Sequence, residues 1–155
     1  MKIEQRLRAL DITLPKVPTP VGTYLPYVTM GNFLYLCGQG PLLPDGTTAL
    51  GKVGREVSLE EAYNRARLTG IVMISVMRDA LGDLDRVIRI GKLLGMVNAV
   101  PEFTEHPAVI NGCSDLFVEV FGERGRHARS SVGMSSLPSN MTVEIEAIVE
   151  FASAA

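Results

Sequence analysis

The sequence has few of the residues that build disulfide frameworks and metal sites. Its 155 residues include two cysteines, two histidines and no tryptophan. Cys37 and Cys113 are too few and too widely separated to form a disulfide framework, and two histidines beside them compose no zinc-binding spacing. We therefore expect a reduced protein without a bound metal.

The sequence also lacks an excess of charge of one sign. Fifteen Lys and Arg stand against seventeen Asp and Glu, a net charge of −2, which gives no general attraction to nucleic acid or to an anionic membrane. The apolar run GIVMISVM at 70–77 is far shorter than a membrane span, and the charged N-terminus MKIEQRLRALDI does not resemble a secretory signal. We expect a cytoplasmic protein with no nucleic-acid partner and no membrane attachment.

The apolar content is high enough for one hydrophobic core. With 46% hydrophobic residues, a chain of this length can bury a core without cross-links, so we predict a single domain over residues 1–155. Residues 1–14 form an N-terminal helical extension, since apolar residues recur there at helical spacing. The proline-rich stretch LPKVPTPVG that follows is predicted to be an extended connector.

Two longer helices are predicted in the body of the chain. Ser58 and Glu61 form a capping box, and the apolar residues behind them share one helical stripe that ends at Gly82. Pro107 suits the first turn of a second helix, whose core-facing stripe ends at Gly122.

Five segments have the β-rich or alternating composition of strands. They are residues 23–30, 33–39, 86–100, 129–136 and 141–152. Gly31-Asn32 suits a two-residue hairpin turn between the first two, and Glu144 and Glu146 share one face of the last. The order of elements predicts an α+β fold, a mixed sheet with two helices packed on one face.

Arg129 and Glu144 are the clearest candidates for chemistry. Arg129 lies among Ala128, Ser130 and Ser131, whose small side chains would let a carboxylate reach the guanidinium and form two parallel hydrogen bonds. A carboxylate such as Glu144 near a bound substrate can direct a water molecule. Charged residues at these places are also typical of a solvated strand face.

Six short motifs resemble, in order and spacing, the reactive intermediate deaminase family, also called Rid or YjgF-like. They are Gly22-Thr23-Tyr24, Cys37-Gly38-Gln39, Asn111, Ala128-Arg129-Ser130, Leu137-Pro138 and Val143-Glu144-Ile145-Glu146-Ala147. The resemblance covers residues 20–152 and is to a longer-chain branch of the family. It implies a chorismate-mutase-like fold assembled as a homotrimer, with three clefts between subunits.

The resemblance also implies an activity, the hydrolysis of a 2-imino or 2-enamino acid to a 2-keto acid and ammonia without a cofactor. Arg129 would hold the carboxylate of this small metabolite, and Glu144 would direct the attacking water. Tyr24, Cys37 and Asn111 match residues that line the pocket, with Cys37 in a place usually held by serine.

Two other functions stay open at this point. The same cleft would serve a non-catalytic trimer that binds a small carboxylate metabolite or a protein partner. Endoribonuclease activity has been ascribed to some members of the family that the sequence resembles. The net charge of −2 and the lack of stacking aromatics in the basic cluster at 124–129 disfavour it.

Overall fold

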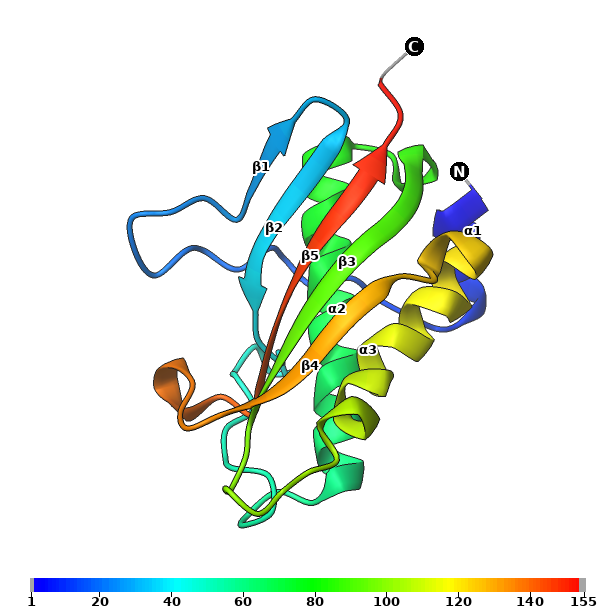
Figure 1. The fold of residues 1–155 in the computed structure, drawn as a ribbon. Coiled ribbons are helices and arrows are strands. Elements are labelled where there is room, and N and C mark those ends of the chain that lie inside the picture. The colour runs from blue at the N-terminus through cyan, green and yellow to red at the C-terminus, as the bar shows by residue number, and fades with distance from the viewer. Residues whose placement is uncertain (1, 154–155) are drawn as a thin grey trace.

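The structure is a computed structural model and describes residues 2–153. Five strands form one sheet in the order β1-β2-β5-β3-β4 (Figure 1). They are β1 (Tyr27–Met30), β2 (Phe33–Gln39), β3 (Val87–Asn98), β4 (Ala128–Met134) and β5 (Val143–Phe151). Neighbouring strands are antiparallel except for β3 and β4, which are parallel, so the predicted mixed α+β sheet is confirmed.

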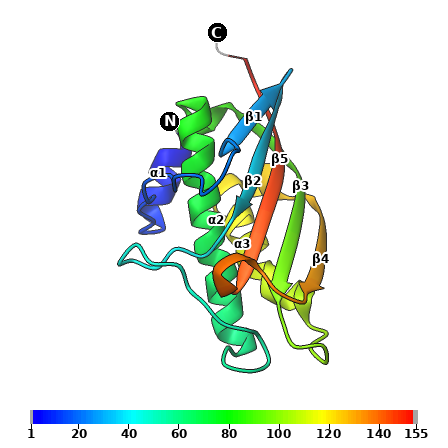
Figure 2. The same ribbon diagram turned by 90° about the vertical axis from the view of Figure 1, so that its left-hand side faces the viewer.

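Helices cover one face of this sheet (Figure 2). The covering helices are α2 (Leu59–Leu81) and α3 (His106–Phe121), whereas α1 (Lys2–Ala9) packs against α3 and the 3₁₀ turn η1 (Leu84–Arg86). Two further 3₁₀ turns are η2 (Gly122–Gly125) and η3 (Pro138–Asn140). The capping box that predicts the start of α2 is present, with Ser58 and Glu61 each accepting a hydrogen bond from the other's backbone N–H. A Cβ at Gly112 would collide with the Tyr63 carbonyl oxygen, so α2 and α3 pack in backbone contact.

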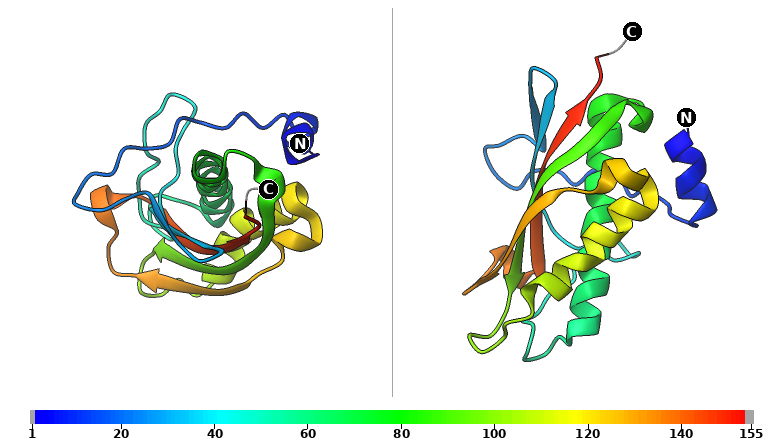
Figure 3. Two further views of the ribbon diagram at one scale, coloured as in Figure 1. Left: turned by 90° about the horizontal axis from the view of Figure 1, so that it is seen from above. Right: turned by 45° about the vertical axis from the view of Figure 1, so that its right-hand side comes forward.

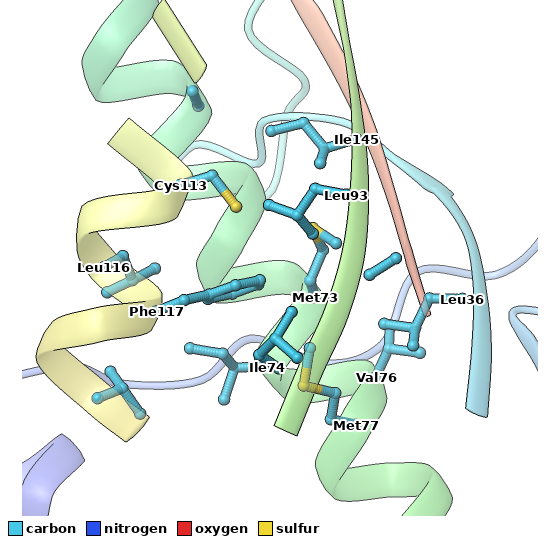
Figure 4. Close-up of a cluster of buried hydrophobic side chains, with 14 of the residues drawn as sticks. Leu36, Met73, Ile74, Val76, Met77, Leu93, Cys113, Leu116, Phe117 and Ile145 are labelled. Atoms are coloured by element: carbon cyan, nitrogen blue, oxygen red, sulfur yellow. The ribbon is translucent and has the colours of Figure 1, made fainter. Parts of the chain in front are cut away.

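The core lies between the sheet and these helices. Figure 4 shows Met73 and Met77 of α2, Leu93 of β3 and Phe117 of α3 converging there, and all four side chains are fully buried. Burial of a side chain of this size stabilises the fold by about 1.5–3 kcal/mol relative to exposure. This core fixes the register of the strands and therefore the direction in which each site residue points.

The other face of the sheet is not covered by any helix of residues 2–153 (Figure 3). Glu144 and Glu146 lie on this open face, as the alternation of β5 predicts. They share it with half-buried apolar side chains, among them Leu94 and Met96. Val132 is 40% exposed there, so the open face mixes acidic and apolar groups.

Some predicted boundaries are wrong. Residues 23–26 are not part of the first strand, because Pro26 has no N–H for a strand ladder and the bend before it is closed by Val21 N–H donating to the Tyr24 hydroxyl. The strand predicted at 86–100 begins only after the 3₁₀ turn η1, which Asp83 caps through the Asp85 N–H. No helix in the described part of the chain is long and apolar enough to cross a membrane.

Candidate active site

Arg129 lies at the start of β4 and points toward the helices. It pairs with Leu93 of β3, whose side chain is buried on the helix-covered face. Its Nη1 donates to the Ser114 hydroxyl at 2.9 Å, and its Nη2 donates to the Pro107 carbonyl at 3.1 Å. The guanidinium is therefore fixed by α3 at the outer edge of the sheet, and three of its five N–H donors, that of Nε among them, bind no group of residues 2–153.

A neutral histidine orients the hydroxyl that holds Arg129. His127 Nδ1 lies 2.6 Å from the Gly125 carbonyl, which can only accept, so Nδ1 carries the proton. Burial, and to a lesser degree the charge of Arg129, lower the pKa of His127 and keep the ring neutral. Its Nε2, 2.9 Å from Ser114 Oγ, then accepts the hydroxyl proton, leaving a Ser114 lone pair for Arg129.

Ser114 and His127 are site residues that no motif in the sequence predicts. The available signal was the spacing of Pro107, Asn111 and Ser114, which places them along one stripe of a helix. In the structure Asn111 is exposed on α3 between the two groups that hold Arg129. Arg129 and Asn111 therefore belong to one group of side chains, the β4–α3 edge.

Tyr24 and Cys37 form part of a second group. Both line a cavity of about 190 Å³, together with Gln39 and the η3 turn. Cys37 Sγ accepts a hydrogen bond from Gln39 Nε2 at 3.1 Å. Burial is the main effect on the thiol and raises its pKa, so Cys37 is protonated at neutral pH and presents a small, weakly polar wall.

Glu144 lies beside this cavity on the open face. A Cβ at Gly38 would collide with the Glu144 carboxylate, so the glycine leaves the space that the carboxylate occupies. Burial, followed by the charge of Glu146, raises the pKa of Glu144. A carboxylate with a raised pKa is a stronger base than an ordinary one, which suits the role of accepting a proton from water.

A polar network holds the turn that forms one wall of the Tyr24 cavity. Asn98 is 1% exposed, accepts from Lys52 Nζ at 2.7 Å and donates to the Asn140 side chain at 2.9 Å. Lys52 Nζ also donates to the Ser135 carbonyl at 2.8 Å. The network holds Asn140 in the left-handed conformation, with φ of 61°, and thereby places η3 against the cavity.

The five predicted site residues thus form two separate groups in one chain. Arg129 and Asn111 lie at the β4–α3 edge, on the helix-covered side. Tyr24, Cys37 and Glu144 lie around the open face and the end of β2. A single chain does not bring its own Arg129 and Glu144 into one pocket.

The chain matches known proteins over nearly its whole length. A family model described as "YjgF/chorismate_mutase-like, putative endoribonuclease" matches residues 4–151. Protein TCP17 of Trypanosoma cruzi is 42% identical over 150 residues, which cover 96% of this chain and 94% of that protein. A 2-iminobutanoate/2-iminopropanoate deaminase of Dermatophagoides farinae is 28% identical over 139 residues, covering 89% of this chain and 93% of the deaminase.

A solved structure agrees with these matches. The crystal structure of an Agrobacterium tumefaciens protein of unknown function superposes with a TM-score of 0.89 at 46% sequence identity, covering 97% of this chain and 94% of that one. Fold, sequence motifs and family model therefore lead to the same assignment, and the chain belongs to the YjgF/RutC/Rid family with its chorismate-mutase-like fold.

Proposed function

We propose that this protein hydrolyses small 2-imino or 2-enamino acids to 2-keto acids and ammonia without a cofactor. The observation that carries the proposal is the fixed guanidinium of Arg129, which α3 holds through two hydrogen bonds while Nε stays available. The similarity to a 2-iminobutanoate/2-iminopropanoate deaminase supports the same reaction class.

The reaction needs positioning more than activation. The carbon of a protonated imine is already electrophilic, so holding the substrate and one water in attack geometry supplies a large part of the rate enhancement. Arg129 binds the substrate carboxylate, and Glu144 takes a proton from the water as its oxygen bonds to that carbon. Glu144 then gives this proton to the nitrogen and takes the proton of the new hydroxyl as the C–N bond breaks, so that ammonia leaves and the 2-keto acid forms.

The proposal includes a homotrimer in which the two groups of site residues come from different chains. Arg129 lies at one edge of the sheet, whereas Tyr24 and Cys37 lie near the other, so a head-to-tail contact between chains is the simplest way to join them. Head-to-tail contacts close into rings when the rotation between subunits allows it. The uncovered, partly apolar face of the sheet would be buried inside such a ring.

The overall charge gives an endoribonuclease site at the basic cluster little support. A net charge of −2 offers no general attraction to a polyanion. Within the cluster, Arg126 pairs with the carboxylate of Glu123 at 3.0 Å, whereas Arg124 and Arg129 are held by neutral oxygens and keep their charge.

The test is imine loss in a coupled assay. An amino-acid oxidase generates 2-imino acids in situ, semicarbazide traps the imine that remains, and the purified protein is compared with Arg129→Ala. Two charge-assisted hydrogen bonds to the substrate carboxylate are at stake, so we expect kcat/KM to fall by about 100-fold or more. The control is Arg126→Ala, which removes a nearby exposed arginine and should leave the activity unchanged.

Three outcomes are informative. Activity that is retained in Arg129→Ala refutes the proposed role of this residue. Binding of a 2-keto acid without any acceleration of imine loss supports instead a non-catalytic protein that binds small carboxylates. Activity that depends on Arg129 across small, branched or aromatic imino acids supports the deaminase and defines its side-chain preference.

A further inference from the structure

A second, larger cavity lies on the helix side of the molecule, away from the open face of the sheet. Its volume is about 910 Å³, against about 190 Å³ for the cavity at Tyr24. Three segments surround it: residues 10–19 of the connector, residues 42–46, and the outer side of α2 from Arg67 to Val72. A volume of this size is typical of pockets that enclose small organic ligands.

The connector forms a wall that only side-chain packing holds in place. Ile12 and Val17 pack against the core, whereas residues 13–20 make no hydrogen bond to any other residue in the described part of the chain. Pro15 and Pro18 have no N–H to offer and keep this wall extended. Leu42 and Leu68 complete an interior that is mainly apolar.

Free hydrogen-bond donors on a cationic side chain at the cavity favour an anion. Arg67 donates from Nη2 to Glu119 at 2.7 Å, while its Nε and Nη1 donate to no other group of residues 2–153. Lys16 faces the same cavity from the connector and is exposed. Asp11 is the single acidic residue of the lining, and Glu119 is the ion-pair partner of Arg67, so the preference for an anion comes from the free Arg67 donors and not from net charge.

We infer that this cavity is a second ligand site, which takes an apolar monocarboxylate. The hydrocarbon part of the ligand lies among the apolar side chains of α2 and the connector. The carboxylate accepts a hydrogen bond from one free donor of Arg67, Nε or Nη1, and the ammonium of Lys16 lines the same cavity. A guanidinium N–H that no protein group occupies can donate a charge-assisted hydrogen bond to a carboxylate.

This site is separate from the proposed active site. The two cavities share a wall at Pro18, Thr19 and Leu42, but neither Arg129 nor Glu144 lines the larger one. Substitutions that test the larger cavity must therefore avoid the shared wall. Arg67 and Leu68 line the larger cavity alone, and Leu68 is not among the side chains packed on the core.

The experiment titrates the full-length protein with octanoate by isothermal titration calorimetry, with 1-octanol as the neutral probe of equal chain length. Arg67→Gln removes the cation, and Leu68→Trp fills the apolar part with an indole. Arg78→Gln is the matched control, because Arg78 lies on the same helix and pairs with Glu4 at 4.0 Å but does not line the cavity. Arg129→Ala tests whether octanoate binds at the proposed active site instead.

We expect saturable octanoate binding that Arg67→Gln weakens by about tenfold or more, through loss of a charge-assisted hydrogen bond. Leu68→Trp should also weaken it, and both Arg78→Gln and Arg129→Ala should leave it unchanged. Because the native chain has no tryptophan, fluorescence of Leu68→Trp reports whether the variant is folded. Equal affinity for 1-octanol overturns the carboxylate class. Binding that only Arg129→Ala abolishes, or that neither cavity variant affects, overturns the second site.

Discussion

Removal of the Ser114 hydroxyl tests how the protein holds Arg129, its main candidate for binding a substrate. Ser114 Oγ lies 2.9 Å from both Arg129 Nη1 and His127 Nε2, accepting from the first and donating to the second. Ser114→Ala deletes both hydrogen bonds and changes little else, because alanine fits wherever serine does on a helix. Arg129 then keeps one partner, the Pro107 carbonyl at 3.1 Å.

The expected loss in the free energy of unfolding follows from the hydrogen bonds that Arg129 and His127 lose in Ser114→Ala. A hydrogen bond to a charged group contributes about 1.5–3 kcal/mol, and a buried acceptor left without a donor costs about 1–3 kcal/mol. Arg129 is only partly buried and can turn to water, so we expect the lower end, about 2 kcal/mol in the free energy of unfolding. For a domain of this size that corresponds to a fall in Tm of about 4–8 °C.

Two measurements check this prediction. Urea unfolding of Ser114→Ala gives the loss of stability, and the imine-loss assay gives kcat/KM, which should fall by about tenfold because the guanidinium is less well positioned. Ser130→Ala is the control, since that hydroxyl accepts only a 3.3 Å contact from Lys92 on the open face. If both variants behave like the native protein, the two hydrogen bonds that link His127, Ser114 and Arg129 have no role in fixing the guanidinium.

Two further predictions concern stability. The pKa of His127 is lowered from its ordinary value of 6.5, so the neutral ring contributes stability that is present above pH 6.5 and is lost as the pH falls through the lowered folded-state pKa. Urea midpoints between pH 5 and 7 should show this decline, and His127→Gln should flatten it. Asn98→Leu removes one acceptor from the Lys52 ammonium, which keeps the Ser135 carbonyl, and removes the donor to the Asn140 side-chain oxygen. Chemical unfolding should show a loss of about 3 kcal/mol, and a variant as stable as the native protein would contradict the network.

The local elements of the fold were predictable because their signals lie close together in the sequence. The capping box of α2 involves residues three positions apart, and the hairpin turn at Gly31 requires only the positive φ of 59° that glycine accepts. The alternation of β5 likewise assigns Glu144 to the open face before any pairing is known. Each of these predictions is confirmed because no distant contact opposes it.

The direction of Arg129 was not predictable in the same way. It depends on the parallel register of β4 with β3, which opposes Arg129 to the buried Leu93, and on α3 lying over that edge. The network of Lys52, Asn98 and Asn140 joins three segments that no sequence window contains. The resemblance to the family supplied Tyr24, Cys37 and Asn111 as site residues, but only the structure shows that the five predicted residues fall into two groups.

This separation leads to a test in mixed oligomers. If each cleft takes Arg129 from one chain and Glu144 from its neighbour, Arg129→Ala and Glu144→Gln are each inactive alone, because every cleft lacks one of the two groups. Refolded together from urea in equal amounts, they should recover activity. In a randomly mixed ring with one such cleft at each interface, about one quarter of the clefts pair an intact Arg129 with an intact Glu144.

The size of the recovery separates the possible arrangements. Activity near one quarter of the native value, dependent on joint refolding, requires clefts shared between chains. Mixing the two folded variants without urea is the control, since subunits that do not exchange should give no recovery. If joint refolding yields stable oligomers that stay inactive while native protein treated in the same way regains its activity, then Arg129 and Glu144 do not act in a common intersubunit cleft. The proposed mechanism would then lose its water-directing carboxylate, because a single chain holds Glu144 on the face of the sheet opposite to Arg129.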